Sequence, residues 1–327
     1  MIQHGRHAGK LRVIFILFMT AAALFAAERR KFKPGFNIFS PAQDVEMGKE
    51  AAAQADKEFP IVKNKTSTAY LNELGKKLVR YAPGETDYPW EFKFVNAEPI
   101  NAFALPGGFI YVNRGTVEAA RNESELAGVV AHEIGHVVMR HSTNRASKAV
   151  IAQAPLRIFG GLLGGGAIGQ LAQMGVGFGF NSVMLKYSRD AETQSDQIAT
   201  YILFDAGYDP KSMATFFQIL EQKYPKRTTQ FFSSHPNPGN RVRNVEQEIP
   251  RLGPAKSYRR DTRAFRSVKR QLGSVPYSQK TEAAAGGTSP AGSSAAQPPP
   301  PPSSRTRINE ADDYLMEYPS NWQLRKG

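Results

Sequence analysis

The strongest chemical signature in this 327-residue chain is the pentapeptide His132-Glu133-Ile134-Gly135-His136. It lies in an apolar run, ELAGVVAHEIGHVVMRH, that predicts a helix from Glu123 to about Arg140. Positions i and i+4 lie on one face of a helix, so both imidazoles can reach one zinc ion. Glu133 lies beside them and can take a proton from a metal-bound water, whose pKa zinc lowers to about 7.

The same pentapeptide also occurs by chance in helices that bind no metal. Here its flanks are apolar and small, as expected for a buried active-site helix. A glutamate and two histidines buried without partners would be costly. The sequence therefore predicts catalytic zinc as the cofactor, with one ion per chain.

A catalytic zinc also needs a third protein ligand and an open coordination position. The extended pattern HExxHxxGxxH is excluded, because this chain has Met139 and Ser142 where that pattern has glycine and histidine. The third ligand is therefore expected further along the chain, on a second helix.

A helix predicted over 187–206 offers carboxylates for this role. Glu192 and Asp196 are four residues apart and share a helix face. Glu192 is favoured as the zinc ligand over Asp190 or Asp196. Asp196 is then placed to hold a ligand histidine from behind.

Four stretches of the chain resemble peptidase family M48, which contains Oma1-like, Ste24-like and exported bacterial zinc proteases. The likeness is strongest to the exported bacterial members and extends over roughly residues 40–250. The stretches are NAFALPGGFIYVNRG (101–115), ESELAGVVAHEIGHVVMRH (123–141), YSRDAETQSD (187–196) and SSHPNPGNRV (233–242). We expect an α+β fold with a zincin-like (gluzincin) core, mostly helical with a small mixed β-sheet.

The resemblance also implies roles for single residues. His132, His136 and Glu192 resemble the zinc ligands, and Glu133 resembles the general base. Asp196 resembles the aspartate of the family's ExxxD pattern. The family often has Glu-Ala-Asp where this chain has Gln194-Ser195-Asp196, a departure that keeps both acids.

A further histidine, His235, belongs to a His-Pro-x-Pro-x-x-Arg element. In relatives this histidine approaches the zinc cleft, as a transition-state donor or as a displaceable extra ligand. Arg241 is expected to orient a carboxylate there. The structural alternative is a helix start at His-Pro and a salt bridge from Arg241. His141 is expected to be structural, capping the C-terminal end of the active helix.

Substrate binding is predicted at a sheet edge, where an added peptide strand is held extended without its sequence being read. The candidate edge is Asn101 to Phe109, and its glycines would let a backbone approach closely. An ordinary hairpin is the alternative, because Pro106 interrupts the strand pattern. The candidate edge-strand residues are Asn101, Ala102, Phe103, Ala104, Gly107 and Gly108.

Several other elements are predicted around the site. Asp44 is a plausible N-cap for a first helix. A second helix is expected over 67–81, a strand over 90–95 and another helix over 210–224. The apolar stripe of the second helix is Tyr70, Leu71, Leu74 and Leu78.

The N-terminus of the chain predicts export, and a low-complexity linker precedes its C-terminal tail. Residues 1–27 read as a signal peptide or N-terminal anchor, because basic residues precede an uncharged run of 15. That run is shorter than the about 20 residues of a membrane span. The predicted segments are an extended lead-in (28–43), a peptidase domain (44–250), a helical or irregular extension (251–282), a disordered linker (283–304) and a short tail (305–327).

Residues 158–180 form a separate feature within the predicted peptidase domain. They carry no charge and nine glycines, too many for a rigid core helix. The segment is interpreted as a mobile lid over the cleft or as a membrane-contacting loop.

The composition limits the alternatives. The absence of cysteine excludes a disulfide scaffold, a thiol nucleophile and a cysteine-bound zinc. The net charge of +13 suggests nucleic acid or anionic lipid as a partner. An export signal and the lack of a nucleic-acid motif favour an anionic membrane surface and argue against nucleic acid.

Together these features predict a zinc endopeptidase of the cell envelope, in the bacterial periplasm or associated with a membrane. Its expected substrates are unfolded or envelope proteins. One alternative is a latent or chaperone-like protein on the same fold, with the zinc site silenced. A zinc aminopeptidase is a second alternative, but no feature is seen that would fix a substrate N-terminus.

Overall fold

The computed structural model describes residues 28–84, 86–153, 186–223, 231, 234–235, 241–278, 306–311 and 314–319. The chain divides into two compact units, Met1–Ala284 and Ala285–Gly327. The predicted signal peptide, the glycine-rich segment 158–180 and the linker 283–304 lie outside the described residues. In the described part of the chain, no helix has the length and apolar character needed to cross a membrane.

A three-stranded mixed sheet forms the centre of the first unit. Its order is β1 (Glu91–Val95), β3 (Phe109–Asn113) and β2 (Ala102–Leu105). β1 runs parallel to β3, whereas β2 runs antiparallel to it. A short 3-10 turn, η1 (Pro106–Gly108), joins β2 to β3. The expected hairpin and small mixed sheet are therefore confirmed, and β2 lies at a sheet edge.

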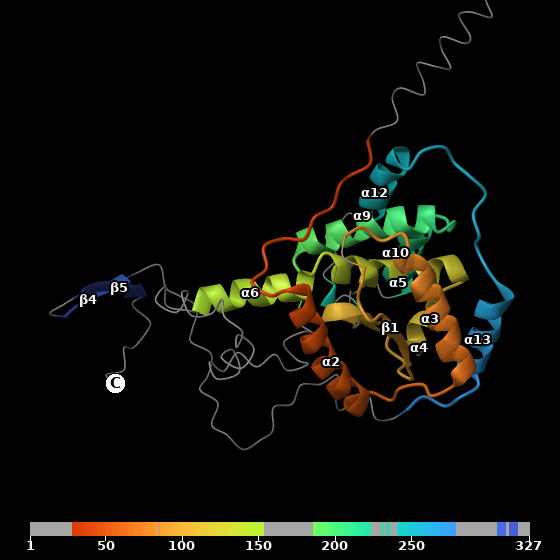
Figure 1. Cartoon of the computed structure of the whole chain (residues 1–327), viewed down its shortest axis with the longest axis horizontal. Helices are drawn as coiled ribbons and strands as arrows, with labels where there is room; N and C mark the ends of the chain where they lie inside the picture. Colours follow the sequence, from red (N-terminus) through yellow and green to blue (C-terminus); the bar gives the residue numbers. More distant parts are fainter. Residues whose placement is uncertain are drawn as a thin grey trace, which may run out of the picture. The chain divides into compact units, whose positions relative to one another are not determined.

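Helices make up most of this unit, as predicted (Figure 1). They are α2 (Pro41–Glu58), α3 (Lys65–Val79), α4 (Arg114–Ala119), α5 (Glu123–Val138), α6 (His141–Gln153), α9 (Arg189–Asp205), α10 (Ser212–Lys223), α12 (Arg241–Glu248), η3 (Ile249–Arg251) and α13 (Arg263–Gly273). α5 contacts β2 and β3 on one side and α9 on the other, and α10 packs on α5. α3 packs on β1, and α13 packs on α3.

The central helix α5 carries the HExxH pentapeptide, and every one of its residues is buried. Asn122 caps it by accepting a hydrogen bond from the Glu125 backbone N–H, which satisfies one of the open donors at the helix start. Gly135 lies against α9, where a Cβ atom would be only 3.1 Å from the Ser195 Cα. The missing side chain therefore lets α9 approach the face that carries the histidines.

The start of α2 differs from the prediction. Ser40 is its N-cap and forms a capping box with Gln43, and Pro41 occupies the first helical position. The prediction that Asp44 is the N-cap is therefore wrong. Asp44 is buried, and its carboxylate pairs with Arg140 at 2.5 Å. The apolar stripe predicted for α3 is confirmed, since all four of its members are buried.

The second unit contains a two-stranded antiparallel hairpin, β4 (Thr306–Ala311) and β5 (Tyr314–Pro319). The sequence analysis predicted only a short tail there. The available signal was weak: β-branched and aromatic residues such as Ile308, Tyr314 and Tyr318 occur there, but neither segment alternates polar and apolar residues.

Candidate metal centre

Two helices bring the three predicted zinc ligands together. His132 and His136 project from α5 with their Nε2 atoms 3.0 Å apart. Glu192 lies in the first turn of α9, whose start is fixed by the N-cap Ser188. Its carboxylate oxygens lie 3.5 Å from His132 Nε2 and 3.4 Å from His136 Nε2. All three side chains are buried.

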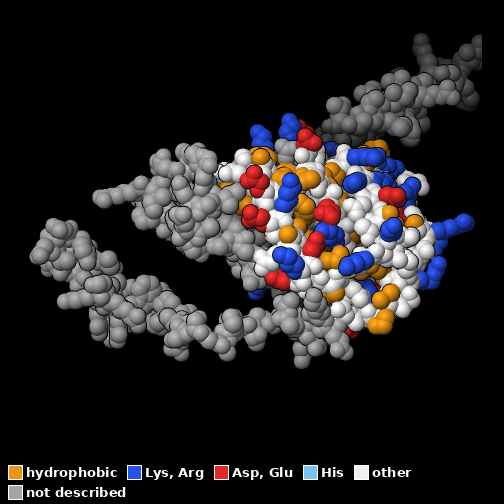
Figure 2. Space-filling view, turned by 60° about the horizontal axis from the view of Figure 1, so that its bottom comes forward, with side chains coloured by type: hydrophobic (Ala, Val, Ile, Leu, Met, Phe, Trp, Pro, Cys, Tyr) orange, Lys and Arg blue, Asp and Glu red, His pale blue; other side chains and the backbone are white. Residues whose placement is uncertain are grey.

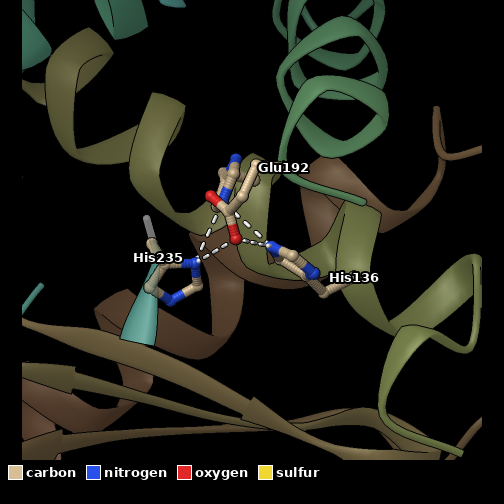
Figure 3. A group of neighbouring side chains, drawn as sticks. His136, Glu192 and His235 are labelled. Carbon is tan, nitrogen blue, oxygen red and sulfur yellow. Dashed lines mark hydrogen bonds and ion pairs between the residues drawn. The ribbon is translucent and has the colours of Figure 1, made fainter. Parts of the chain in front are cut away.

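His235 completes the cluster (Figure 3). Its Nδ1 atom lies 3.1 Å from Glu192 Oε1 and 3.3 Å from His132 Nε2. One ligand atom from each of His132, His136, Glu192 and His235 lies within 4.8 Å of the others. Three imidazole nitrogens and a carboxylate oxygen are a donor set that zinc accepts, so the residues fit the expected ion.

Glu133 is the least satisfied side chain of this group. It is fully buried, and within the described residues neither carboxylate oxygen has a hydrogen-bond partner. The His235 ring lies beside it, with Nε2 3.5 Å from Glu133 Oε1. Burial raises the pKa of Glu133, although His235 and His132 oppose the rise. An orphaned buried carboxylate is costly, which fits a site that binds water and a cation.

The two glutamates of the cluster differ in their environments. Burial alone would raise the pKa of Glu192, but the neighbouring His235, His132 and His136 hold that pKa well below its usual range. The pKa of Glu133 moves the opposite way. Carboxyl groups whose pKa values are pushed apart suit different tasks, which is compatible with the prediction of Glu192 as ligand and Glu133 as base.

Asp196 and Arg241 support His132 from behind. Asp196 Oδ1 lies 2.9 Å from His132 Nδ1. Arg241, the first residue of α12, donates two hydrogen bonds to the Asp196 carboxylate, from Nε at 2.8 Å and from Nη2 at 2.6 Å. Its Nη2 also lies 3.2 Å from Glu192 Oε2. The structure thus brings both residues to the site that the sequence analysis assigned to them.

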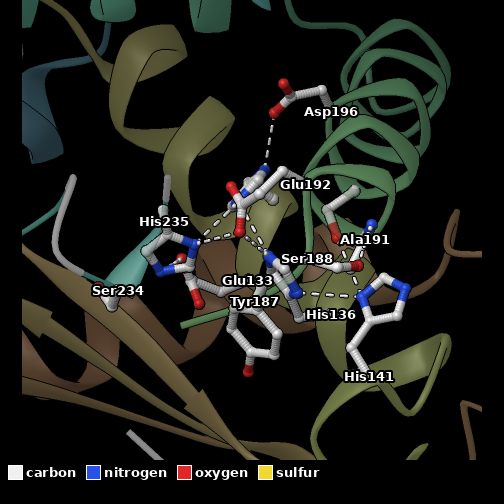
Figure 4. A network of polar contacts seen from close by, with 12 residues as sticks. Glu133, His136, His141, Tyr187, Ser188, Ala191, Glu192, Asp196, Ser234 and His235 are labelled. Atoms are coloured by element: carbon white, nitrogen blue, oxygen red, sulfur yellow. Dashed lines mark hydrogen bonds and ion pairs between the residues drawn. The ribbon is translucent and has the colours of Figure 1, made fainter. Parts of the chain in front are cut away.

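His141 has an equivalent place behind His136, which the sequence analysis missed (Figure 4). Its Nδ1 lies 3.0 Å from His136 Nδ1, and its Nε2 lies 2.8 Å from Gln194 Oε1. The expected capping of α5 by His141 is wrong, because both of its ring nitrogens contact side chains rather than the backbone carbonyls at the end of that helix. No spacing rule pairs His141 with Gln194, which is 53 residues away.

The bonds of His141 fix which nitrogens carry protons. Burial lowers the pKa of His141 to about 4, so the ring is neutral and carries one proton. Since Gln194 Oε1 can only accept, that proton lies on His141 Nε2. His141 Nδ1 is then an acceptor, and His136 donates to it from Nδ1. This leaves the lone pair of His136 Nε2 directed at the cluster.

Tyr187 is a second residue that sequence reasoning missed. Its ring stacks on the His136 imidazole with centroids 3.8 Å apart. Its hydroxyl lies 2.9 Å from Ser142 Oγ. Tyr187 precedes α9 directly, so the loop that leads into the ligand helix also packs against the other ligand helix.

The predicted edge strand lies beside the cluster, and Asn101 to Ala104 are all buried. A cavity of about 10 Å³ separates β2 from α5, between Ala104 and His136. Gly107 has a positive φ of 70°, and a Cβ atom there would lie 2.6 Å from the Val45 Cα. The backbone that approaches this glycine closely is therefore that of α2. A role for β2 in substrate binding stays a prediction.

A model of peptidase family M48 matches residues 65–249, a range that contains the whole cluster. The beta-barrel assembly-enhancing protease of Escherichia coli strain K12 is 31% identical over 226 residues, 67% of this chain and 46% of that protein. The mitochondrial metalloendopeptidase OMA1 of Schizosaccharomyces pombe is 30% identical over 193 residues, 56% of this chain and 53% of that protein.

A shorter relative covers a similar part of the chain. The metalloprotease LoiP of Escherichia coli strain K12 is 26% identical over 202 residues, 62% of this chain and 75% of that protein. The chain spans about half the length of the first two relatives.

Proposed function

The chain belongs to peptidase family M48, and from this we propose that it is a zinc-dependent endopeptidase of the cell envelope. It would hydrolyse peptide bonds in misfolded or envelope proteins. The observation that supports this best is the buried cluster of four ligand atoms beside the unpartnered carboxylate of Glu133. The name of the Escherichia coli beta-barrel assembly-enhancing protease supports the placement in the envelope.

In this proposal His132, His136 and Glu192 hold the zinc ion on a zincin-like (gluzincin) core. Bound zinc would supply Lewis-acid polarisation of the substrate carbonyl and a lowered pKa for water. Glu133 accepts the proton of the attacking water at a carboxylate oxygen and returns it to the leaving amine. Its low-dielectric surroundings strengthen each of these interactions.

The other predicted residues serve this chemistry indirectly. Asp196 and Arg241 keep the imidazole of His132 in one orientation. His235 Nε2 has no hydrogen-bond partner in the part of the chain that the structure describes, and it lies on the Glu133 side of the cluster. With a proton on Nε2, His235 would be a donor to a developing oxyanion. The β2 edge would hold the substrate peptide extended beside the site.

A latent form is the second candidate, and one observation favours it. His235 Nδ1 lies among the other ligand atoms, and none of the four ligand residues is more than 2% exposed. A zinc ion bound by all four side chains would lack the open position that catalysis requires. In a latent or chaperone-like protein, His235 would be the ligand that closes the site.

The segments outside the described residues complete the proposal. Residues 1–27 would direct export, and the segment 158–180 would act as a lid or membrane-contacting loop. The peptidase domain would extend over 44–250, followed by the extension, the linker and the tail.

Cleavage of casein by the full chain tests the proposed function. We expect Glu133→Gln to lower the rate by roughly 100-fold or more, because a general base contributes about that factor. Equal zinc content in the two proteins controls for folding of the site. An unchanged rate in the glutamine variant would refute the proposed role of Glu133.

The same assay separates the two candidates through His235→Phe. The aromatic ring keeps the stacking of His235 on Phe231, whose centroid lies 4.8 Å away. A higher rate than wild type identifies His235 as a closing ligand. A lower rate identifies it as a donor in the reaction.

A further inference from the structure

A second surface of the molecule is strongly basic. Residues 65–80 and 251–278 hold 12 of the 42 Lys and Arg residues of the chain but only two of its 29 acids, Glu73 and Asp261. The excess of ten positive charges there accounts for most of the net charge of +13. Nine of these twelve side chains are exposed. Seven of the nine lie on α3 and α13 or close to their ends, and they are here called the basic face: Lys65, Lys76, Arg80, Arg260, Arg263, Arg266 and Arg270.

Two helices carry this face. α3 and α13 run antiparallel, because Ser67 at the start of α3 hydrogen-bonds Gln271 at the end of α13. α13 buries Phe265, Val268 and Leu272. Its three arginines, Arg263, Arg266 and Arg270, follow the complementary i, i+3, i+7 spacing and point away from the core. Lys and Arg side chains gather along the right-hand side of Figure 2, the side on which α13 lies in Figure 1.

The charges on the basic face are largely uncompensated. Among the described residues, Arg266 is its one member with an ion pair, to Asp261 at 2.5 Å. A groove of about 540 Å³ lies between the two helices, and its lining includes Lys65, the acidic Glu73 and Ala264. Like charges gathered on one face repel one another, and an anionic partner would relieve this.

We propose that the basic face docks the protein onto the phosphate headgroups of an anionic membrane. This rests on the proposed place of the protein in the cell envelope. Cations spread over two exposed helices suit a planar layer of phosphates, with about 1 kcal/mol contributed by each Lys or Arg near such a surface. α3 packs on β1, at the opposite sheet edge from β2, so docking leaves the predicted substrate strand uncovered.

Vesicle co-sedimentation tests the proposal. The full chain carries Glu133→Gln, so that peptide hydrolysis does not interfere with the binding measurement. The increment in binding is measured between phosphatidylcholine vesicles and vesicles that also contain phosphatidylglycerol. R263E/R270E should weaken the phosphatidylglycerol-dependent binding by at least roughly 25-fold, at about fivefold for each arginine lost, and repulsion of the two glutamates adds to this loss. K33E/K49E, two exposed lysines elsewhere, changes the net charge equally and should alter binding by less than about threefold.

Three results would overturn the proposal. Equal losses of phosphatidylglycerol-dependent binding in R263E/R270E and K33E/K49E would show that the net charge, and not the basic face, determines binding. Binding that does not depend on phosphatidylglycerol would exclude recognition of anionic headgroups. Tighter binding to duplex DNA than to the anionic vesicles, lost in R263E/R270E, would assign the face to nucleic acid. All three leave the proposed peptidase activity untouched, because that is measured separately on casein.

Discussion

At the scale of single residues, the proposed zinc ligand His136 has the most informative surroundings. Tyr187 stacks on its ring, and His141 fixes its Nδ1 proton. His132 is held instead by Asp196, which Arg241 braces. The two ligand histidines are thus oriented by different chemistry, a neutral relay through Gln194 for one and a charged pair for the other.

The neutral relay can be tested with two nearly isosteric substitutions. Asparagine at position 141 places Oδ1 near the former Nδ1 and can still accept from His136, whereas leucine cannot. We expect His141→Leu to weaken zinc affinity roughly tenfold or more, because such supporting bonds contribute about 10–100-fold. His141→Asn should lose less than about threefold.

Competition with a chromogenic chelator measures both zinc affinities without any need for activity. The thermal midpoint of the metal-free proteins controls for packing at this buried position. Equal affinities for the asparagine and leucine variants would show that the acceptor atom has no role.

Residue spacing predicted His132, His136, Glu192 and Asp196 as neighbours, but it did not predict the contacts of His141 and Tyr187 with His136. The i, i+4 pairs of α5 and α9 place His132 with His136 and Glu192 with Asp196 on single helix faces, and the structure brings both pairs together. The contact between His141 and Gln194 depends on how α5, α6 and α9 pack. Packing between helices far apart in sequence leaves no periodic signal in either one.

At the scale of elements, the arrangement of the helices depends on two glycines at which backbones approach each other closely. α9 reaches α5 across Gly135, and α2 reaches the η1 turn across Gly48. A Cβ atom at Gly48 would overlap the Pro106 carbonyl oxygen, and backbone atoms cannot move aside as a flexible side chain can. The turn between β2 and β3 is therefore fixed by a helix rather than by its own residues alone.

Gly48→Ala should destabilise the protein despite the better helix propensity of alanine. We expect a loss of about 1–3 kcal/mol in the free energy of unfolding, as for other overpacked sites. Denaturant unfolding measures it, with the exposed neighbour substitution Lys49→Ala as a control expected within about 0.5 kcal/mol of wild type. A variant as stable as wild type would mean that α2 does not pack on the turn as described.

Elements were predictable where the local pattern was complete. Alternation predicted β1, and the Pro-Gly-Gly interruption predicted the β2–β3 hairpin. The start of α2 was misplaced because Asp44 satisfies the residue preference of a cap while its carboxylate is committed to Arg140. Local preference cannot reveal such a long-range partner. The β4–β5 hairpin was missed because a polar tail gives a weak strand signal.

At the scale of the whole molecule, the basic face and the candidate metal centre are built on different helices. The ligand cluster lies on α5 and α9 with His235, while the basic face lies on α3 and α13. The net charge was evident from composition, but its concentration on two neighbouring helices depends on the fold. This separation lets surface binding and peptide hydrolysis be altered independently.

The most direct test of the central claim is zinc per chain, measured by elemental analysis of the purified full-length protein. We predict one zinc ion in wild type and in Glu133→Gln, because the proposed role of Glu133 is that of a base and not of a ligand. Glu192→Gln should retain well below one, since an amide is a poorer zinc ligand than a carboxylate. Absence of zinc from wild type, or a full complement in Glu192→Gln, would contradict the assignment of this cluster as a zinc site built on α5 and α9.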